Sequence, residues 1–276
     1  MSCSLSVKAW RLATRFNFNL KLSKNVKSMQ RFAILRRLFI KTYIMKKYTL
    51  VIAVLACTLM LSVSSRAQTV TRNVSGYTGV ESNGPFNVTV TIDGTESIKL
   101  DVDADALDDI KTEVENGVLK VGFKNGWKNH RNLKHANIYI TAKSLNYLAN
   151  GGSGSTVLTG MLTGDNAKVS VSGSGNLKCA VTSQSLDLHV SGSGGLDVKG
   201  STGQADVSVS GSGSINGRQL KTETVSARIS GSGEVVLIAN KSVSGRISGS
   251  GSLQYSGNAT IGESHTSGSG RISKID

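Results

Sequence analysis

The C-terminal half of the chain alternates apolar and polar residues on both sides of a recurring Gly–Ser tetrapeptide. The tetrapeptide is GGSG at 151–154 and SGSG in six later copies, and successive copies begin 18 to 21 residues apart. If the first residue of each copy is position zero, positions −3, −1, +5 and +7 are mostly apolar and the positions between them mostly polar. A period of two is typical of β-strands that face a core on one side. Positions −1 and +5 of the SGSG copies are Val171, Val190, Val209, Ile229, Ile247 and Thr266, then Leu177, Leu196, Ile215, Val235, Leu253 and Ile272.

Seven copies with a period near 19 residues predict a solenoid rather than a flexible linker. One repeat buries too little apolar surface to offset the entropy of ordering it, so the repeats must stack on one another. We therefore expect an all-β parallel β-helix, with one coil per repeat, a rise of about 4.8 Å per coil and right-handed winding. The glycines of each SGSG are expected at corners. The serines are expected in exposed ladders that hydrogen-bond along the axis.

The ends of the solenoid are predicted to differ from its middle. In the last repeat, Thr266 and Lys274 occupy positions that are mostly apolar elsewhere, as an end cap requires. At the other end, residues 77–150 predict an N-terminal cap of longer strands. We expect one short helix there, over 105–113 and capped by Asp105. Asn116–Gly117 predicts a hairpin turn.

Charge and composition change sharply at residue 67. Residues 1–67 hold 13 Lys and Arg and no acidic residue, whereas residues 68–276 hold 19 basic and 18 acidic residues. The net charge of +14 therefore belongs to the N-terminal quarter, and the remainder is not expected to bind nucleic acid. Seven aromatic residues after residue 67 exclude a large aromatic core, and three cysteines exclude a disulfide-stapled scaffold. Cys179 falls in an apolar column, and we expect a free, unreactive core thiol.

The N-terminal quarter contains an export signal. Met45-Lys46-Lys47, an apolar run to Val63 and the small residues Ser65 and Ala67 predict a signal peptide over 45–67. The mature domain is then 68–276, with a non-repeat part (68–150) and a repeat part (151–276). It would contain no membrane-spanning segment, and it would be periplasmic, surface-bound or extracellular. A lipid anchor at Cys57 is the alternative. Residues 1–44 are interpreted as a mis-annotated or disordered extension, with a transit peptide as the alternative.

The order of these segments resembles a known family. VSGYTGVESNGPFNVTVTIDG, SIKLDVDADALDDIKTEVENGVLKVGFKNG, NIYITAKSLNYLANGGSG and the repeated VSVSGSG together resemble the head GIN domain family, over about residues 74–275. The family's members are described as heads of autotransporter adhesins and are common in Bacteroidetes-type bacteria. The resemblance implies a secreted β-helical domain with an adhesive role, and it implies no catalytic residues.

One segment stands out as a candidate binding surface. Residues 124–135 combine the single tryptophan of the mature chain with basic residues between two strands, which predicts an exposed loop. Aromatic and basic side chains together suit a glycan or an anionic partner. The alternative is an ordinary hairpin loop. The candidate ligand-binding residues of this loop are Trp127, Lys128, His130, Arg131 and Lys134.

A second candidate lies in the repeats. At position −2, a parallel stack would place Arg228 and Arg246 side by side with His265 next to them, a possible site for an anionic glycan or a carboxylate. A solvated charged face is the alternative. In the next outward column, Asp187 and Asp206 form a carboxylate pair that would serve either as screened surface charges or in glycosidase chemistry.

Neither a metal site nor a serine nucleophile is predicted. The Asp101-x-Asp103-x-Asp105 pattern lacks the glycine and glutamate of a calcium loop, with Ala106 and Thr112 in their places. No SGSG serine has glycines two residues away on both sides, as a nucleophile elbow requires. We expect no cofactor.

These observations predict a secreted binding module and adhesin without enzyme activity. Its partner would be a surface ligand, either a glycan or a matrix protein. Two other functions stay open: a structural solenoid of the envelope, and a polysaccharide-active β-helix enzyme. The sequence leaves the oligomeric state undetermined.

Overall fold

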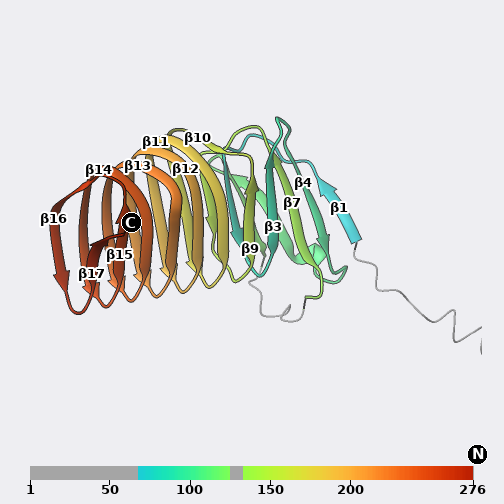
Figure 1. The fold of residues 1–276 in the computed structure, drawn as a ribbon. Helices are drawn as coiled ribbons and strands as arrows, with labels where there is room; N and C mark the ends of the chain where they lie inside the picture. Colours follow the sequence, from blue (N-terminus) through green and yellow to red (C-terminus); the bar gives the residue numbers. More distant parts are fainter. Residues whose placement is uncertain (1–67, 125–132, 276) are drawn as a thin grey trace, which may run out of the picture. The chain divides into compact units, whose positions relative to one another are not determined.

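The computed structural model describes residues 68–124 and 133–275, which belong to one compact unit spanning Ser65–Asp276. This unit is the predicted all-β solenoid (Figure 1). Its described residues form seventeen strands and one 3-10 turn, η1 (Leu107–Asp109). The strands are β1 (Gln68–Arg72), β2 (Gly79–Asn83), β3 (Asn87–Ile92), β4 (Ser97–Val102), β5 (Ile110–Glu115), β6 (Val118–Phe123), β7 (Ala136–Ala142), β8 (Tyr147–Asn150), β9 (Ser155–Thr159), β10 (Leu162–Gly173), β11 (Asn176–Gly192), β12 (Gly195–Gly211), β13 (Ser214–Gly231), β14 (Glu234–Gly249), β15 (Ser252–Ser256), β16 (Thr260–Ser267) and β17 (Arg271–Lys274).

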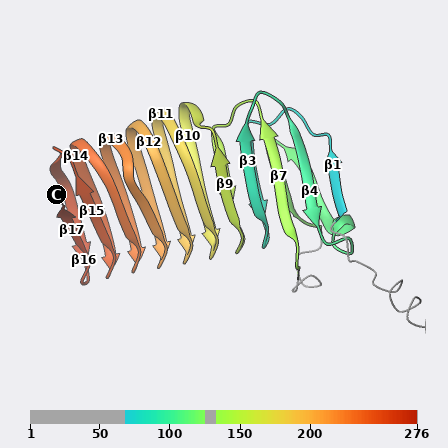
Figure 2. The ribbon, with the colours of Figure 1, turned by 45° about the vertical axis from the view of Figure 1, so that its right-hand side comes forward.

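The strands form two long sheets that meet at a corner edge, the line of Gly–Ser tetrapeptides. Sheet A lies on the N-terminal side of each tetrapeptide and has the order β5–β6–β2–β8–β10–β11–β12–β13–β14–β16. Sheet B lies on the C-terminal side and has the order β1–β4–β7–β3–β9–β11–β12–β13–β14–β15–β17. Strands β11 to β14 start in sheet B, bend across a third side and end in sheet A, and Figure 2 shows them side by side.

The repeats stack in parallel and in the predicted register. Position −1 aligns from Val171 through Val190, Val209 and Ile229 to Ile247. All five side chains are at most 2% exposed. Because every coil places a β-branched side chain at the same point, the interior is a set of continuous apolar columns.

The glycines occupy the corners, as predicted, and they do so for two different reasons. The first glycine of each SGSG has a positive φ, for example 110° at Gly173 and 104° at Gly211, which disfavours any other residue. At the second glycine, an added Cβ would overlap neighbouring atoms. At Gly213 these atoms include the Val190 side chain and the Gly194 carbonyl oxygen.

The predicted hydrogen-bonded serine ladder is wrong. The SGSG serines are mostly exposed, but within the described residues none of their hydroxyls makes a hydrogen bond with another side chain or with the backbone. The backbone makes these bonds instead, because each corner amide reaches the carbonyl of the preceding coil. Ser193 N donates to Gly173 O (3.0 Å), and Ser212 N donates to Gly192 O (2.9 Å).

The N-terminal end is closed by antiparallel strands. β4 runs antiparallel to β7, and β1 antiparallel to β4. The hairpin β5–β6 turns at Asn116 (φ 52°) and Gly117 (φ 76°), which confirms the predicted turn. Arg72 joins the two sheets at this end: its Nη1 donates to Ile110 O (2.7 Å) and its Nη2 to Leu107 O (3.1 Å).

The predicted helix over 105–113 is wrong. The structure has only the turn η1, whose N-cap is Ala106 without a side-chain hydrogen bond, and β5 begins at Ile110. Ile110 is fully buried and pairs with Phe123 of β6. The segment Ile110–Glu115 contains β-branched residues that favour a strand, and pairing with β6 outweighs the weak helix preference of the preceding acidic residues.

The C-terminal end is open and polar. All eight residues of β16 are exposed, in agreement with the degraded last repeat. In the part of the chain that the structure describes, no helix combines the length and the apolar character needed to cross a membrane.

Candidate functional site at the corner edge

The loop residues singled out in the sequence lie mostly outside the described residues. This holds for Trp127, Lys128, His130 and Arg131, as it does for the signal peptide and Cys57. Lys134 is described and exposed, and its backbone N–H donates to the Asp103 carboxylate (2.7 Å). A possible ligand role of these residues therefore stays a prediction.

The column at position zero runs along the whole corner edge and changes character near the N-terminal part. In the repeats it consists of serines, such as Ser172 and Ser191. Towards the N-terminal end it continues through Gly151 and Asn83 to Gly122, which pairs with Asn83. Glycines thus flank a single asparagine where the repeats place serines.

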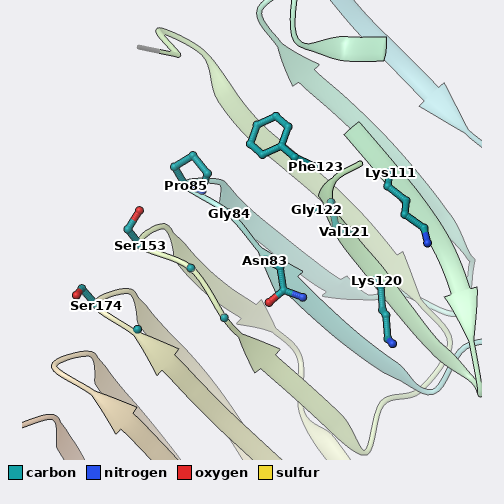
Figure 3. Close-up of a pocket in the computed structure, with 13 residues that line it drawn as sticks. Asn83, Gly84, Pro85, Lys111, Lys120, Val121, Gly122, Phe123, Ser153 and Ser174 are labelled. Atoms are coloured by element: carbon teal, nitrogen blue, oxygen red, sulfur yellow. The ribbon is translucent and has the colours of Figure 1, made fainter. Parts of the chain in front are cut away.

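The missing side chains open a groove of about 600 Å³ along this edge. An added Cβ at Gly151 would overlap the Asn83 Oδ1, so the width of the groove depends on glycine. Figure 3 shows Asn83 in the middle, Lys111 and Lys120 on one side, and the serines on the other. The lining residues are Asn83, Gly84, Pro85, Lys111, Lys120, Val121, Gly122, Phe123, Gly151, Gly152, Ser153, Gly173 and Ser174.

The apolar part of the groove comes from an altered corner. Asn83-Gly84-Pro85-Phe86 stands where the repeats have SGSG, so Pro85 replaces the second serine. Phe86 replaces the second glycine and points inward, 1% exposed. Its ring packs on Phe123 with centroids 5.0 Å apart and planes at 41°. The wall is therefore rigid and apolar.

The two lysines of the groove are paired with carboxylates of β5. Lys111 Nζ lies 2.6 Å from the Glu113 carboxylate, and Lys120 Nζ lies 2.8 Å from Glu115. Hydrogen bonds to these carboxylates raise the pKa of both lysines, and the two lysines lower the pKa of Glu115. These shifts favour the charged forms of Lys111, Lys120 and Glu115 at neutral pH.

A buried asparagine fixes the corner beneath the groove. Asn150 is 1% exposed, and its Nδ2 donates to Gly154 O (2.8 Å) and Asn176 O (3.1 Å). Its Oδ1 accepts from Gly152 N (3.2 Å). The Gly151–Gly154 corner is thereby held in one conformation. The sequence signals of this site are the change from SGSG to GGSG and the NGPF corner, whose significance sequence reasoning missed.

Arg228 and Arg246 lie elsewhere on the solenoid. Their predicted adjacency is confirmed, because Arg228 pairs with Arg246 and Arg246 with His265 on the outer face of sheet A. Neither guanidinium makes a hydrogen bond or an ion pair with another described residue. β13, which carries Arg228, is three strands from β10 at the rim of the groove, about 14 Å. The structure therefore does not bring the two arginines into the groove.

The remaining sequence candidates are the paired aspartates of the repeats and the residues considered as metal ligands. Asp187 and Asp206 are neighbours in register, as expected. In residues 68–124 and 133–275, no group of three His, Cys, Asp or Glu side chains is placed to hold a metal ion.

Parallel coils, apolar columns and glycine corners define the class of this protein as a β-solenoid with a groove at its edge. Residues 76–259 match the family described as "Putative auto-transporter adhesin, head GIN domain", and the chain belongs to this head GIN domain family. The resemblance found in the sequence is thereby confirmed.

Solved structures share the fold. A "putative adhesin" from Bacteroides fragilis is 25% identical, with a TM-score of 0.69, and the match covers 76% of this chain and 99% of that one. A "putative lipid binding protein" from Parabacteroides distasonis is 24% identical, with a TM-score of 0.63 and coverage of 77% and 98%. A "putative adhesin" from Parabacteroides merdae is 18% identical, with a TM-score of 0.58 and coverage of 77% and 98%. No curated protein matches the sequence.

Proposed function

We propose that the protein is an exported, non-catalytic binding module that acts as an adhesin and uses the corner groove as its ligand site. The observation that carries this proposal is the interruption of the serine column by Gly122 and Gly151, which opens the groove around Asn83. The family and its structurally similar adhesins support a binding role.

The chemistry of the groove favours binding over catalysis. Its lysines are held in ion pairs, and its two serines, Ser153 and Ser174, make no hydrogen bond with a base among the described residues. A serine without an activating base is a poor nucleophile. What the groove offers is an amide, two hydroxyls and the apolar faces of Pro85 and Phe123, a combination that suits a neutral glycan or an extended peptide of a matrix protein.

The sequence of the 124–135 segment gives this proposal further support. It leaves the corner edge directly after Phe123, which lines the groove, and β7 begins at Ala136 on the same edge. We therefore keep the prediction that Trp127 and Arg131 contribute to ligand binding.

The test is a binding screen of the protein against glycans and matrix proteins, followed by the Gly151→Ser variant. This change restores the SGSG sequence and places a side chain in the groove, where it must displace the flexible end of Asn83. We expect loss of the ligand with little change in melting temperature. Ser210→Thr, which adds bulk at the same position of another corner, is the matched control. Undiminished binding by Gly151→Ser would reject the groove, and the absence of any ligand would favour a structural role in the envelope.

The predicted signal peptide over 45–67 can be tested separately. Mass spectrometry of the exported protein should show Gln68 at the N-terminus. A mature chain that begins at a lipidated Cys57 would overturn it.

A further inference from the structure

Sheet B presents a straight row of outward side chains, one from each of six neighbouring strands. The row crosses β7, β3, β9, β11, β12 and β13, and each member is in register with the next. We call it the sheet B strip; its residues are Tyr139, Thr89, Val157, Lys178, Asp197 and Asn216.

One half of the strip is an exposed apolar platform. Tyr139 is 43% exposed and Val157 is 38% exposed, and they stand on either side of the short Thr89. Lys99 Nζ lies 5.9 Å from the centroid of the Tyr139 ring, within the range of a cation–π contact. The Lys99 ammonium thus lies over one face of the exposed Tyr139 ring, and Val157 adds an exposed aliphatic side chain on the other side of Thr89.

The other half is a pocket of about 450 Å³ with an excess of positive charge. Lys178, Lys199 and Arg218 line it, and Asp197 is the one carboxylate among its lining residues. Lys178 Nζ lies 3.9 Å from Asp197, whereas Lys199 and Arg218 form no ion pair within the described residues. Two cations of the pocket are therefore available to an anion.

Polar contacts hold the middle of this pocket together. Asn216 Nδ2 donates to Asp197 Oδ1 (3.2 Å), and Arg218 Nη1 donates to Asn216 Oδ1 (3.5 Å). Asp197 thus orients Asn216, which in turn contacts Arg218. Asp197 balances one of the three cations that line the pocket, so the pocket keeps a net positive charge.

The pocket exists because one coil is irregular. The register between β12 and β13 shifts after Asp197, and the register between β13 and β14 shifts between Gly217 and Lys221. The bulge places Arg218 and Gln219, both exposed, over the outer face of sheet B. Bulges commonly redirect side chains next to functional sites.

We infer that the sheet B strip binds an acidic glycan, a chain of sugars that carry carboxylate or sulfate groups. The ring face of Tyr139 and the side chain of Val157 suit the apolar face of a sugar. Asn216 and Gln219 suit its hydroxyls, and Lys199 and Arg218 suit the oxyanion. Five strand spacings of about 4.8 Å give the strip a length of about 24 Å, enough for several sugars laid along the solenoid axis. The strip shares no residue with the lining of the corner groove, so it is a second site that does not depend on the first.

Calorimetric titration of the purified protein tests this inference. The probes are an alginate hexasaccharide, which carries carboxylates, a chondroitin sulfate hexasaccharide, which also carries sulfates, and the neutral cellohexaose. We expect an acidic hexasaccharide to bind and cellohexaose not to bind. The ratio of the two acidic affinities identifies which oxyanion the pocket prefers.

Variants locate the site. The double variant Lys199→Gln/Arg218→Gln removes the two unpaired cations and should weaken binding by about tenfold or more, since hydrogen bonds to charged groups carry such factors. Tyr139→Ala should weaken binding and Tyr139→Phe should retain it. The matched control is Lys168→Gln/Lys221→Gln, which removes the same charge from two exposed lysines outside the strip and should leave the affinity unchanged. Melting temperatures verify that each variant is folded.

Four outcomes would overturn the inference. Equal losses in the two double variants would show non-specific attraction of a polyanion. Full affinity in Tyr139→Ala would show that the apolar platform takes no part in binding. Failure of both acidic hexasaccharides to bind the wild-type protein would reject the site itself. Loss of binding in Gly151→Ser, with Lys199→Gln/Arg218→Gln unaffected, would assign the glycan to the corner groove and reject the strip.

Discussion

The repeat part and the N-terminal part of the domain close their coils in different ways. In the repeats, the interior is filled mainly by aliphatic side chains, and the corner between sheets A and B is in each coil a Gly–Ser tetrapeptide whose hydroxyls make no hydrogen bond with the described residues. In residues 68–150, the interior holds Tyr77 and Phe86, the corners vary, and antiparallel strands close the end. The comparison teaches that the regular part supplies a rigid frame, whereas candidate binding features arise where regularity fails, at the altered corner around Asn83 and at the β13 bulge.

The largest expected effect comes from breaking a column in the regular part. Val209→Asp should unfold the domain, because Val209 is 1% exposed and an unpaired buried carboxylate destabilises by more than about 4 kcal/mol. Ser208→Asp, one residue earlier on the outer face, should change stability by less than about 0.5 kcal/mol. Thermal denaturation measures both. Equal shifts in the two variants would show that the register of sheet A is wrong.

The second-largest loss of stability is expected from removing a buried amide, that of Asn150, at the junction of the two parts. Asn150→Ala leaves the carbonyl oxygens of Gly154 and Asn176 without this donor and should cost about 2–3 kcal/mol. Ser82→Ala is the contrast, because the buried Ser82 Oγ has no hydrogen-bond partner among the described residues. Its removal should be neutral or slightly stabilising. Chemical denaturation would compare them, and a larger loss in Ser82→Ala would mean that its hydroxyl is satisfied by bound water.

Disrupting the N-terminal closure should cost less stability than disrupting the apolar columns. Arg72→Gln removes the bonds to Ile110 O and Leu107 O that join β1 to the β5 end, at a cost of about 1.5–3 kcal/mol. Hydrogen exchange should show the loss of protection confined to β1, β4 and β5. Uniform loss of protection across β11–β14 would contradict the expectation that the effect of Arg72 is local to the N-terminal closure.

The smallest effect at neutral pH comes from Cys179, whose contribution to stability changes only above about pH 9. Burial, with a lesser contribution from Asp197, raises the pKa of the Cys179 thiol from 9.0 to about 12. Between these values the folded protein retains a proton that the unfolded chain releases, so the contribution of this group is complete below pH 9 and falls as pH rises through the window. Cys179→Ala should therefore show a shallower loss of stability than wild type, by at most about 1.4 kcal/mol per pH unit. The raised pKa of Tyr77, also about 12, acts in the same direction in both proteins. Rapid reaction of native Cys179 with a thiol reagent would place it outside the core.

The regular half of the fold could be predicted from the sequence, because its signals are local and repeated. Alternation around SGSG identified the inward residues such as Val209, and the repeat length identified the coil. The same reasoning failed for 105–113, where pairing of Ile110 with β6 decides the structure. It also predicted hydrogen bonds between serine hydroxyls, whereas the corner backbone makes the hydrogen bonds between coils.

The candidate sites could be predicted much less well. Gly151 is visibly different from the later copies, but its neighbour Asn83 is 68 residues away and reaches it only because β2 lies beside β8. The sheet B strip joins Tyr139, Val157 and Lys178 through the pairing of six strands, in which β3 lies between β7 and β9 although it precedes both in the chain. These residues are neighbours because of the strand topology, and the periodicity of the sequence does not predict such neighbours.

The position of β2 and β3 has a consequence for how the chain must fold during export. These strands come first in the chain among the parallel coils, yet they lie between β6 and β8 and between β7 and β9, which follow them. A chain that emerges N-terminus first therefore keeps one edge of its first coil incompletely paired until about residue 142 has appeared, and the other edge until about residue 159. From then on, each further repeat finds a complete template at the moment it is delivered. Assembly should thus show one long delay followed by rapid addition of coils, and the delay should be governed by the N-terminal part alone.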